Sequence, residues 1–180
     1  MSSTTTASGG MNLIGVNISG GEFGTGTAGT NYVYPNTQEI DYYASQGMTV
    51  FRLPYLIENL EQTPGGPLNQ SDLQQLQSIV AYAATKGMDV ILDPHDYGSA
   101  WGNEILPGNT TESQYDNFLT QFASAFKGYS NVIFEEMNEP NQQSAQQQGQ
   151  IAQDALNAIR AGGANQEVLL DGTSWDGAWT

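Results

Sequence analysis

The stretch NVIFEEMNEP, residues 131–140, places a strand pattern directly before a chemically useful side chain. Val132, Ile133 and Phe134 are β-branched or aromatic, so they predict a buried strand. Glu139 follows, and the proline after it ends the pairing because proline has no N–H to donate. A carboxylate at the carboxyl end of a parallel strand lies where α/β barrels carry out their chemistry.

The same strand pattern recurs along the chain at intervals of about 40 residues. A glycine precedes each later strand, as expected where a helix ends and the chain turns into a strand. Apolar residues at spacings of three and four fill the segments between the strands and predict helices. Ser71 with Gln74 predicts a capping box at the start of one of these helices. Five strands alternating with four helices predict an α/β fold with a parallel sheet and right-handed crossovers.

Composition excludes several classes of function. The chain has 180 residues, with 4 Lys and Arg against 19 Asp and Glu, and a formal net charge of -15. It would repel nucleic acids and anionic membranes but not a neutral polysaccharide. It has no cysteine, so disulfides and cysteine nucleophiles are excluded. No stretch approaches the ~20 apolar residues of a membrane span.

The chain divides into two parts. Residues 1–10 are rich in Ser and Thr, without a basic or long apolar run, which predicts a flexible linker or a cloning remnant. A linker would indicate a secreted, modular protein. Residues 11–180 contain all the strand and helix patterns. Their strand-to-helix connections are long at residues 19–35, 54–70 and 94–111, and long loops on one side of a βα repeat mark the functional face.

The Asn138-Glu139-Pro140 motif resembles the acid/base motif of glycoside hydrolase family 5, a family of endoglucanases. The resemblance implies a retaining endo-β-1,4-glucanase that acts on cellulose or a related β-glycan, with no cofactor or metal. It implies that Glu139 is the catalytic acid/base and that Asn138 binds the sugar 2-hydroxyl. It also implies a (β/α)8 (TIM) barrel, of which residues 11–180 would form the N-terminal part, resembling half a barrel. A complete barrel typically needs ~250 residues.

Other segments extend this resemblance. Phe51-Arg52-Leu53-Pro54 resembles the second-strand motif, whose arginine pairs with the nucleophile, and Leu92-Asp93-Pro94-His95-Asp96-Tyr97 resembles the third-strand motif, with Asp96 in place of the usual asparagine. Similarity to the first loop and to the region after the fifth strand adds further candidates. The substrate-binding candidates are Arg52, His95, Asn138, Tyr97, Trp101, Trp175 and Glu22.

Two adjacent acids, Glu135 and Glu136, end the strand before the motif. Neighbouring residues of a strand face opposite sides of the sheet, so one of them should point to the barrel interior. A buried glutamate needs a partner, and Arg52 is the expected one.

The resemblance covers five of the eight βα units, and the family's nucleophile, a glutamate on the seventh strand, lies outside it. Three functions therefore compete: a glucanase present as a fragment or short form, a catalytically silent carbohydrate-binding or self-assembling half-barrel, and a metal-dependent barrel enzyme using Asp93, His95 and Asp96. An uncovered apolar inner face, including Leu13, Val50 and Ile133, would favour a homo-oligomer.

Overall fold

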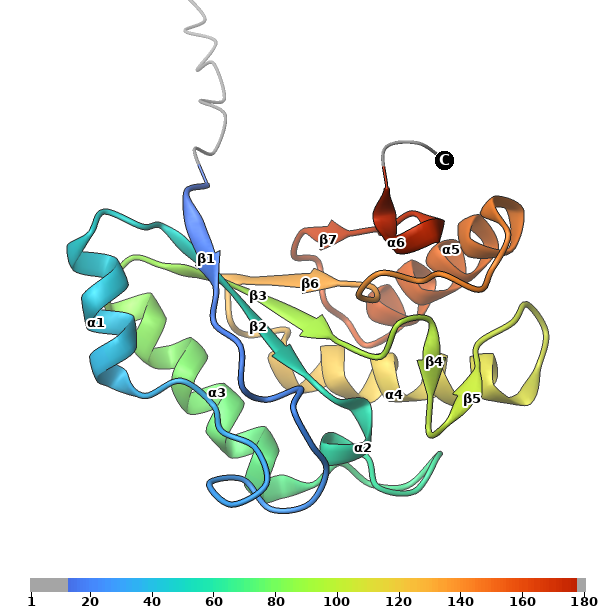
Figure 1. Ribbon diagram of the computed structural model, residues 1–180, viewed down its shortest axis with the longest axis horizontal. Coiled ribbons are helices and arrows are strands. Elements are labelled where there is room, and N and C mark those ends of the chain that lie inside the picture. The colour runs from blue at the N-terminus through green and yellow to red at the C-terminus, as the bar shows by residue number, and fades with distance from the viewer. Residues whose placement is uncertain (1–12, 178–180) are drawn as a thin grey trace, which may run out of the picture.

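A five-stranded parallel sheet forms the centre of the computed structural model, which describes residues 13–177 (Figure 1). The strands lie side by side in chain order, and every pairing is parallel. The predicted parallel α/β fold is confirmed, although the first strand is shorter than its apolar pattern. The strands are β1 (Gly15–Asn17), β2 (Val50–Tyr55), β3 (Asp89–Pro94), β6 (Val132–Glu135) and β7 (Val168–Leu169).

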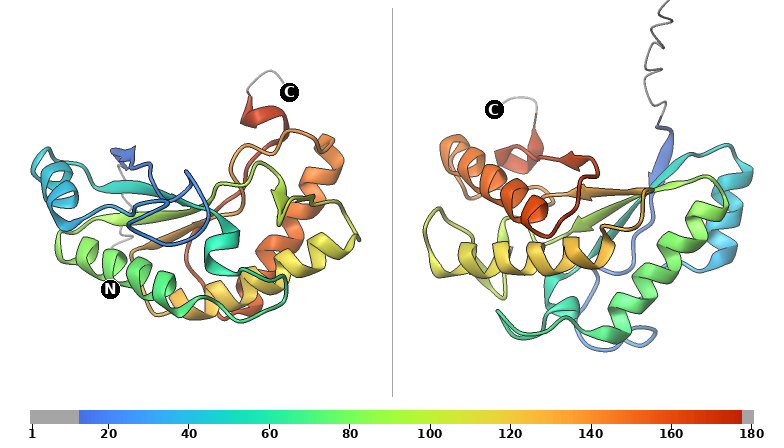
Figure 2. Two further views of the ribbon diagram at one scale, coloured as in Figure 1. Left: turned by 60° about the horizontal axis from the view of Figure 1, so that its bottom comes forward. Right: turned by 180° about the vertical axis from the view of Figure 1, so that it is seen from behind.

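Four long helices connect these strands, as the spacing of apolar residues predicts. Figure 2 shows α3 and α4 against one face of the sheet, and no helix of residues 13–177 crosses the opposite, inner face. None of the helices in this part of the chain is long and apolar enough to cross a membrane. The long helices are α1 (Thr37–Ser45), α3 (Gln70–Thr85), α4 (Thr110–Phe126) and α5 (Ala145–Ala161).

The loops after the strands contain small elements that the sequence pattern does not predict. Two short helices and a two-stranded antiparallel hairpin lie in these connections. They give a defined structure to the loops on the side of the sheet where the site is expected. These elements are α2 (Ile57–Leu60), β4 (Ser99–Ala100), β5 (Asn103–Glu104) and α6 (Thr173–Asp176).

Helix α3 begins earlier than the Ser71–Gln74 capping box predicts. Its N-cap is Asn69, whose side chain accepts a hydrogen bond from the Ser71 backbone N–H at 3.1 Å. Asparagine is as good an N-cap as serine, and it lies two residues earlier. The helix therefore starts at the first residue that can satisfy its free N–H groups.

An aromatic row on α4 forms the core between the sheet and the helices. Phe118, Phe122 and Phe126 follow each other at the spacing that places them on one helix face, and all are buried. The Phe122 ring lies 5.2 Å from that of Tyr55 on β2 and 6.3 Å from that of Phe134 on β6, measured between centroids. This contact holds the central strands, and hence their carboxyl ends, in a fixed relative position.

The inner face of the sheet is less apolar than expected. Val50 and Ile133 are only 6% and 4% exposed, whereas Leu13 is 40% exposed. Arg52 and Glu135 share this face and pair with each other across the sheet. The apolar surface that would drive self-association is therefore smaller than the strand sequences suggest, because charged side chains occupy the centre of the face.

Candidate active site

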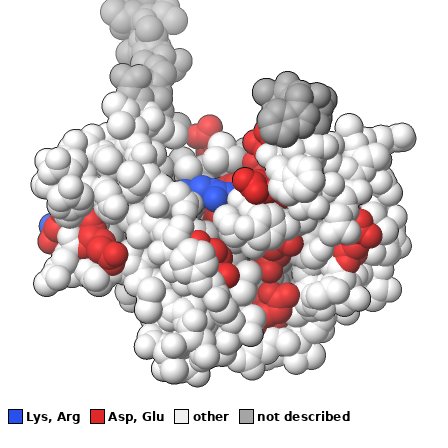
Figure 3. Space-filling view, in the orientation of Figure 1, with Lys and Arg blue, Asp and Glu red and all other residues white. Residues whose placement is uncertain are grey.

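Two hollows lie at the carboxyl ends of the strands and contain most of the predicted site residues. Figure 3 shows a basic group in the central hollow with acidic groups around it. The first hollow, about 300 Å³ and here called the Glu139 pocket, is lined by Arg52, Glu135, Asn138, Glu139, Asp171, Trp175 and Asp176. The second, about 350 Å³ and here called the Tyr97 pocket, is lined by Glu22, Phe23, Leu56, Glu58, His95, Asp96, Tyr97, Ser99, Ala100 and Gly102.

Arg52, in the middle of β2, contacts three other residues of the site. Its Nε donates to Glu135 Oε2 at 2.6 Å and its Nη2 donates to Glu135 Oε1, which makes the pair bidentate. Nη1 lies 2.8 Å from Asp93 Oδ2, and Nη2 also donates to Asn138 Oδ1 at 2.8 Å. Burial alone would lower the pKa of Arg52, but Glu135 and Asp93 outweigh it and raise that pKa. The guanidinium therefore stays charged and fixes three side chains at once.

The predicted partnership of Arg52 and Glu135 is thus present in the structure, and Glu136 faces the other way. Glu136 is fully buried, and the Gln148 side chain on α5 donates to its carboxylate at 3.2 Å. Burial and the nearby charge of Asp171 raise the pKa of Glu136 to about 8. Glu136 is therefore a neutral acid in the core at pH 7, outside both pockets.

A chain of polar side chains runs from Arg52 to the Tyr97 pocket. Asp93 is buried, and its Oδ2 accepts from His95 Nδ1 at 2.7 Å. Burial raises the pKa of Asp93 to about 6, although His95 and Arg52 oppose this rise. In a neutral imidazole, a proton held at Nδ1 by Asp93 leaves Nε2 as an acceptor. The Tyr97 hydroxyl, 3.1 Å from Nε2, can then donate to it.

Asn138 and Glu139 lie next to each other but in different surroundings. Asn138 is 3% exposed, and its Nδ2 is buried without a hydrogen-bond partner among the described residues. Arg52 holds its Oδ1, so the amide presents a donor with a fixed orientation. Glu139 is exposed, and its φ of 43° is unusual for a residue with a side chain. This backbone twist follows the end of β6 and places Glu139 at the Glu139 pocket.

Asp171 is a site residue that the sequence analysis missed. It follows β7 and lines the Glu139 pocket, and its Oδ2 is buried without a hydrogen-bond partner among the described residues. Burial, then the charge of Glu135, raises the pKa of Asp171 to about 8. The signal that could have identified it is the one used for Glu139, a carboxylate directly after an apolar strand. Asp176 lines the same pocket and was missed too.

Asp96 does not join Asp93 and His95 in a metal site. Its Oδ2 accepts from the Ile57 backbone N–H at 3.1 Å, and burial, then the charge of Glu58, raises the pKa of Asp96 well above its ordinary value. Residues 13–177 contain no group of three or more His, Asp or Glu side chains placed to hold a metal ion. Asp96 instead ties the loop after β3 to the start of α2, so the metal-dependent alternative has no ligand set here.

The remaining candidates lie in different places. Glu22 lines the Tyr97 pocket, and its carboxylate accepts from the Gly20 N–H at 2.6 Å. Trp175 is 58% exposed at the Glu139 pocket, so its ring can reach a ligand. Trp101 lines neither pocket, because its indole N–H donates to the Glu61 carbonyl oxygen at 2.7 Å and its ring packs on the core. Trp179, the other tryptophan in the region after the fifth strand, lies outside the described residues.

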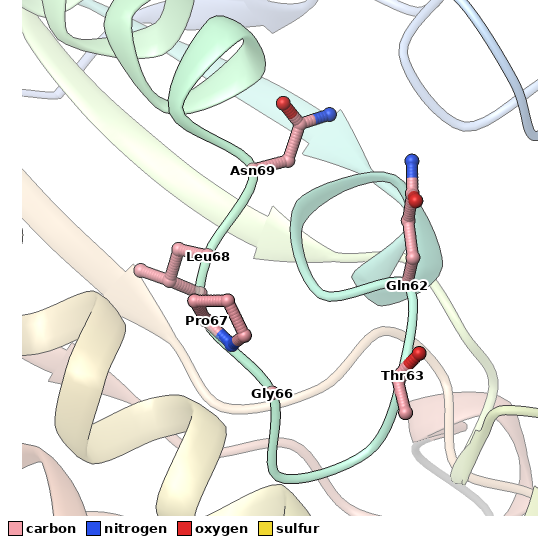
Figure 4. Close-up of a pocket in the computed structure, with 6 residues that line it drawn as sticks. All are labelled: Gln62, Thr63, Gly66, Pro67, Leu68 and Asn69. Carbon is pink, nitrogen blue, oxygen red and sulfur yellow. The ribbon is translucent and has the colours of Figure 1, made fainter.

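A third hollow lies away from this arrangement, in the loop that joins α2 to α3. Figure 4 shows the loop folding back on itself, with its residues around the hollow. The buried Glu61 carboxylate closes the loop by accepting from the Gly65 N–H. No carboxylate or basic side chain lines this hollow, so we assign it no catalytic role. Its lining residues are Gln62, Thr63, Gly66, Pro67, Leu68 and Asn69.

Comparison with known proteins places this geometry in a family. The family model described as Cellulase (glycosyl hydrolase family 5) matches residues 5–180. Endoglucanase gh5-1 of Neurospora crassa is 34% identical over 181 residues, which is 97% of this chain and 45% of that protein. Endo-beta-1,4-glucanase A of Emericella nidulans is 34% identical over 178 residues, 96% of this chain and 53% of that protein.

Solved structures agree with the sequence comparison. XacCel5A in complex with cellopentaose has a TM-score of 0.87 and 35% identity, covering 92% of this chain and 54% of that one. Pseudomonas stutzeri endoglucanase Cel5A in complex with cellobiose has a TM-score of 0.85 and 34% identity, covering 95% and 53%. The chain thus spans about half the length of the relatives that it matches.

Proposed function

Because the chain belongs to the cellulase family, glycosyl hydrolase family 5, we propose that it carries the acid/base half of a retaining endo-β-1,4-glucanase site. In this proposal Glu139 protonates the glycosidic oxygen as the leaving sugar departs, and then accepts a proton from the attacking water. The substrate is a β-1,4-glucan. Two similar proteins of known structure were solved with cellopentaose and cellobiose, which supports this substrate class.

The observation that carries the proposal is the unpaired amide of Asn138 beside Glu139. A buried N–H without an acceptor costs free energy until a ligand supplies one. A sugar 2-hydroxyl can accept this hydrogen bond, and the contact strengthens in the transition state. Arg52 holds the amide in the required orientation. His95, Tyr97, Glu22 and Trp175 complete the proposed sugar-binding surface, and a stacking role for Trp101 stays a prediction.

The second carboxylate of the reaction is not available among the described residues. Retaining hydrolysis needs a nucleophile about 5–5.5 Å from the acid/base carboxyl. Glu135 is held by Arg52, and burial raises the pKa of Asp171 and disfavours its charged form, so neither is a free nucleophile. The same observation favours the second candidate function, a catalytically silent carbohydrate-binding module.

One experiment separates these functions. Glu139→Gln keeps the shape of the side chain but cannot donate the proton. If a second carboxylate completes the site, we expect the wild type to release reducing sugar from a soluble β-1,4-glucan and the variant to release none, while both bind cellopentaose. Binding without hydrolysis by the wild type would support the silent module. Full activity of the variant would contradict the role of Glu139.

The chain is also proposed to act outside the cell and to self-associate. A glucan polymer is too large to enter a cell, so its hydrolase has to reach it outside. Exposed apolar side chains lie beside both edge strands: Leu13 and Ile14 are 40% and 63% exposed next to β1, and Leu170 is 49% exposed next to β7. Pairing of these edges between copies would bury them. Light scattering that gives the mass of one chain would contradict self-association.

A nucleophile from Asp93 or Asp96 of a second copy is not favoured. Asp93 is buried and held by Arg52 and His95. Asp96 accepts a hydrogen bond from the Ile57 N–H. Either carboxylate would have to break these contacts before it could approach another copy's Glu139.

A further inference from the structure

Gln143 is a buried polar side chain that lines neither the Glu139 pocket nor the Tyr97 pocket. It lies in the loop after β6 and is 4% exposed. Its Nε2 donates to the Gly98 carbonyl oxygen at 2.7 Å and to the Ile105 carbonyl oxygen at 3.0 Å. These two carbonyl groups flank the β4–β5 hairpin, in the connection after β3. One side-chain amide therefore joins the loop after β6 to the loop after β3.

The backbone of Gln143 joins a third loop to these two. The Thr173 hydroxyl, at the start of α6, donates to the Gln143 carbonyl oxygen. The Trp175 N–H donates to the Pro140 carbonyl oxygen at 3.2 Å, which is a second contact between the same two loops. Gln143 itself follows β6 and contacts the connections after β3 and β7, and all three connections lie beyond the carboxyl ends of the strands (Figure 1).

Gly98 lies close against the Gln143 amide. A Cβ added at Gly98 would lie 2.6 Å from Gln143 Oε1, and the φ of 82° at this position also favours glycine. Oε1 is buried without a hydrogen-bond partner among the described residues. The side chain therefore holds the loops through the two hydrogen bonds that its Nε2 donates, in a space that leaves the amide little freedom to move.

The three loops joined by Gln143 contain strained backbone at the site residues. Tyr97, Glu139 and Trp175 have positive φ values of 55°, 43° and 59°, and each lies in a different one of these loops. Every other non-glycine residue of positive φ among residues 13–177 also lies in these loops. Such conformations cost free energy and persist only where surrounding contacts fix them. The contacts of Gln143 lie between the loops and can supply this restraint.

We propose that Gln143 is a positioning residue that fixes the Tyr97 pocket relative to the Glu139 pocket, and thereby sets the affinity for a glucan chain that spans both. This inference rests on the proposed function for the class of ligand. Tyr97 lines the first pocket, and Glu139 and Trp175 line the second. A ligand in one pocket does not depend on the spacing of the two, whereas a ligand that occupies both gains affinity only if their geometry lets it reach both at once.

The test compares a long and a short ligand. Gln143→Met keeps the approximate length of the side chain and removes both donated hydrogen bonds. Calorimetry would measure the affinity of wild type and variant for cellopentaose, as the ligand of both pockets, and for cellobiose, as the ligand of one. We expect the affinity for cellopentaose to fall about tenfold and that for cellobiose to change by less than about threefold. A residue that only supports the fold would change both affinities alike.

Hydrogen exchange in the free protein tests the loop contacts without a ligand. The Ile105 N–H, which donates to the Gly98 carbonyl oxygen, reports on the loop after β3, and the Trp175 N–H reports on the loop after β7. Exchange of both should be about tenfold faster in Gln143→Met than in wild type. Thr173→Val removes only the hydroxyl contact. It should speed exchange at Trp175 and weaken cellopentaose binding more than cellobiose binding, and it decides the question if Gln143→Met does not fold.

Gln166 provides a matched control. Its Nε2 also donates to two backbone carbonyl oxygens, those of Phe126 at 3.0 Å and Tyr129 at 3.1 Å, and its Oε1 also lacks a partner among the described residues. It joins the end of α4 to the segment before β7, near the amino ends of the strands. Gln166→Met should therefore leave unchanged the ratio of the two affinities and the exchange of the Ile105 and Trp175 N–H groups.

The possible outcomes are distinct. Equal losses for the two ligands in Gln143→Met, or no loss for either, overturn the positioning role and leave the proposed function intact. Unchanged exchange of the Ile105 and Trp175 N–H groups overturns the role of Gln143 in holding the loops. Failure of the wild type to bind cellopentaose overturns the proposed function and this inference with it.

Discussion

Replacing Glu136 by glutamine should stabilise the protein at neutral pH and have little effect near pH 4. Glu136 is fully buried, faces the neutral amide of Gln148 and has no cationic partner among the described residues. Glutamine has the same shape, its carbonyl oxygen can accept from Gln148, and it does not ionise. The substitution therefore removes one titration from the folding equilibrium and little else.

The sign and size of the effect follow from linkage. The folded-state pKa of Glu136, about 8, lies above its ordinary value of 4.5, so the folded protein binds more protons than the unfolded chain. Its favourable contribution is complete below about pH 4.5 and is lost as the pH rises towards about 8. The interval from pH 4.5 to pH 7 is about 2.5 pH units, and each unit corresponds to ~1.4 kcal/mol. Glu136→Gln should therefore raise the free energy of unfolding by ~3 kcal/mol at pH 7.

Urea unfolding followed by tryptophan fluorescence measures this difference. Wild type, Glu136→Gln and the exposed control Glu167→Gln should be compared near pH 4, 7 and 8. We expect the gain of Glu136→Gln over wild type to grow with pH, and the control to follow wild type. A gain that does not change with pH would refute the reasoning, because it would arise from packing. A loss at every pH would show that the carboxyl group has a stabilising partner.

Three further predictions concern stability. Arg52→Leu should lower the free energy of unfolding by about 3–5 kcal/mol at pH 7, because Glu135 would lose its cation. This loss should shrink in acid, which urea unfolding at two pH values would measure; equal losses would contradict the ion-pair argument. Phe122→Ala should lower the free energy of unfolding by about 3–5 kcal/mol, and a loss below about 1 kcal/mol would show that the core refills the space. Ser144→Ala should cost about 1 kcal/mol by removing the α5 N-cap; Ser113→Ala, inside α4, is its control and should change the unfolding midpoint less.

The family assignment depended on short motifs, and it is confirmed by the family match over residues 5–180. The order of strands and helices also followed from the sequence, because period-2 and period-3.6 patterns reflect which side of each element is buried. Glycines 47 and 87 ended helices as predicted, with φ of 82° and 70°. Boundaries were less certain: the start of α3 depended on a choice between two residues that both cap helices well.

Pairing between distant residues was decided only by the tertiary structure. The sequence placed Arg52 within a strand and Glu139 at a strand end. It also suggested Arg52 as the partner of Glu135, because a buried glutamate needs one. It could not show that the charge of Glu135 would help to raise the pKa of Asp171, 36 residues later, since that depends on the register of β6 with β7. Nor could it show that Asp96 would bind the Ile57 N–H rather than join His95.

The position of the Trp101 ring shows the same limit. A loop tryptophan has the same local sequence whether its ring faces a ligand or the core. Here a hydrogen bond from the Trp101 indole N–H to the Glu61 carbonyl oxygen holds the ring against the core. Local pattern therefore determined the elements, their order and the strand ends that carry the chemistry. Three-dimensional packing determined the protonation and the hydrogen-bond partner of each acid, because desolvation and Coulomb interactions depend on distances that the order of residues does not contain.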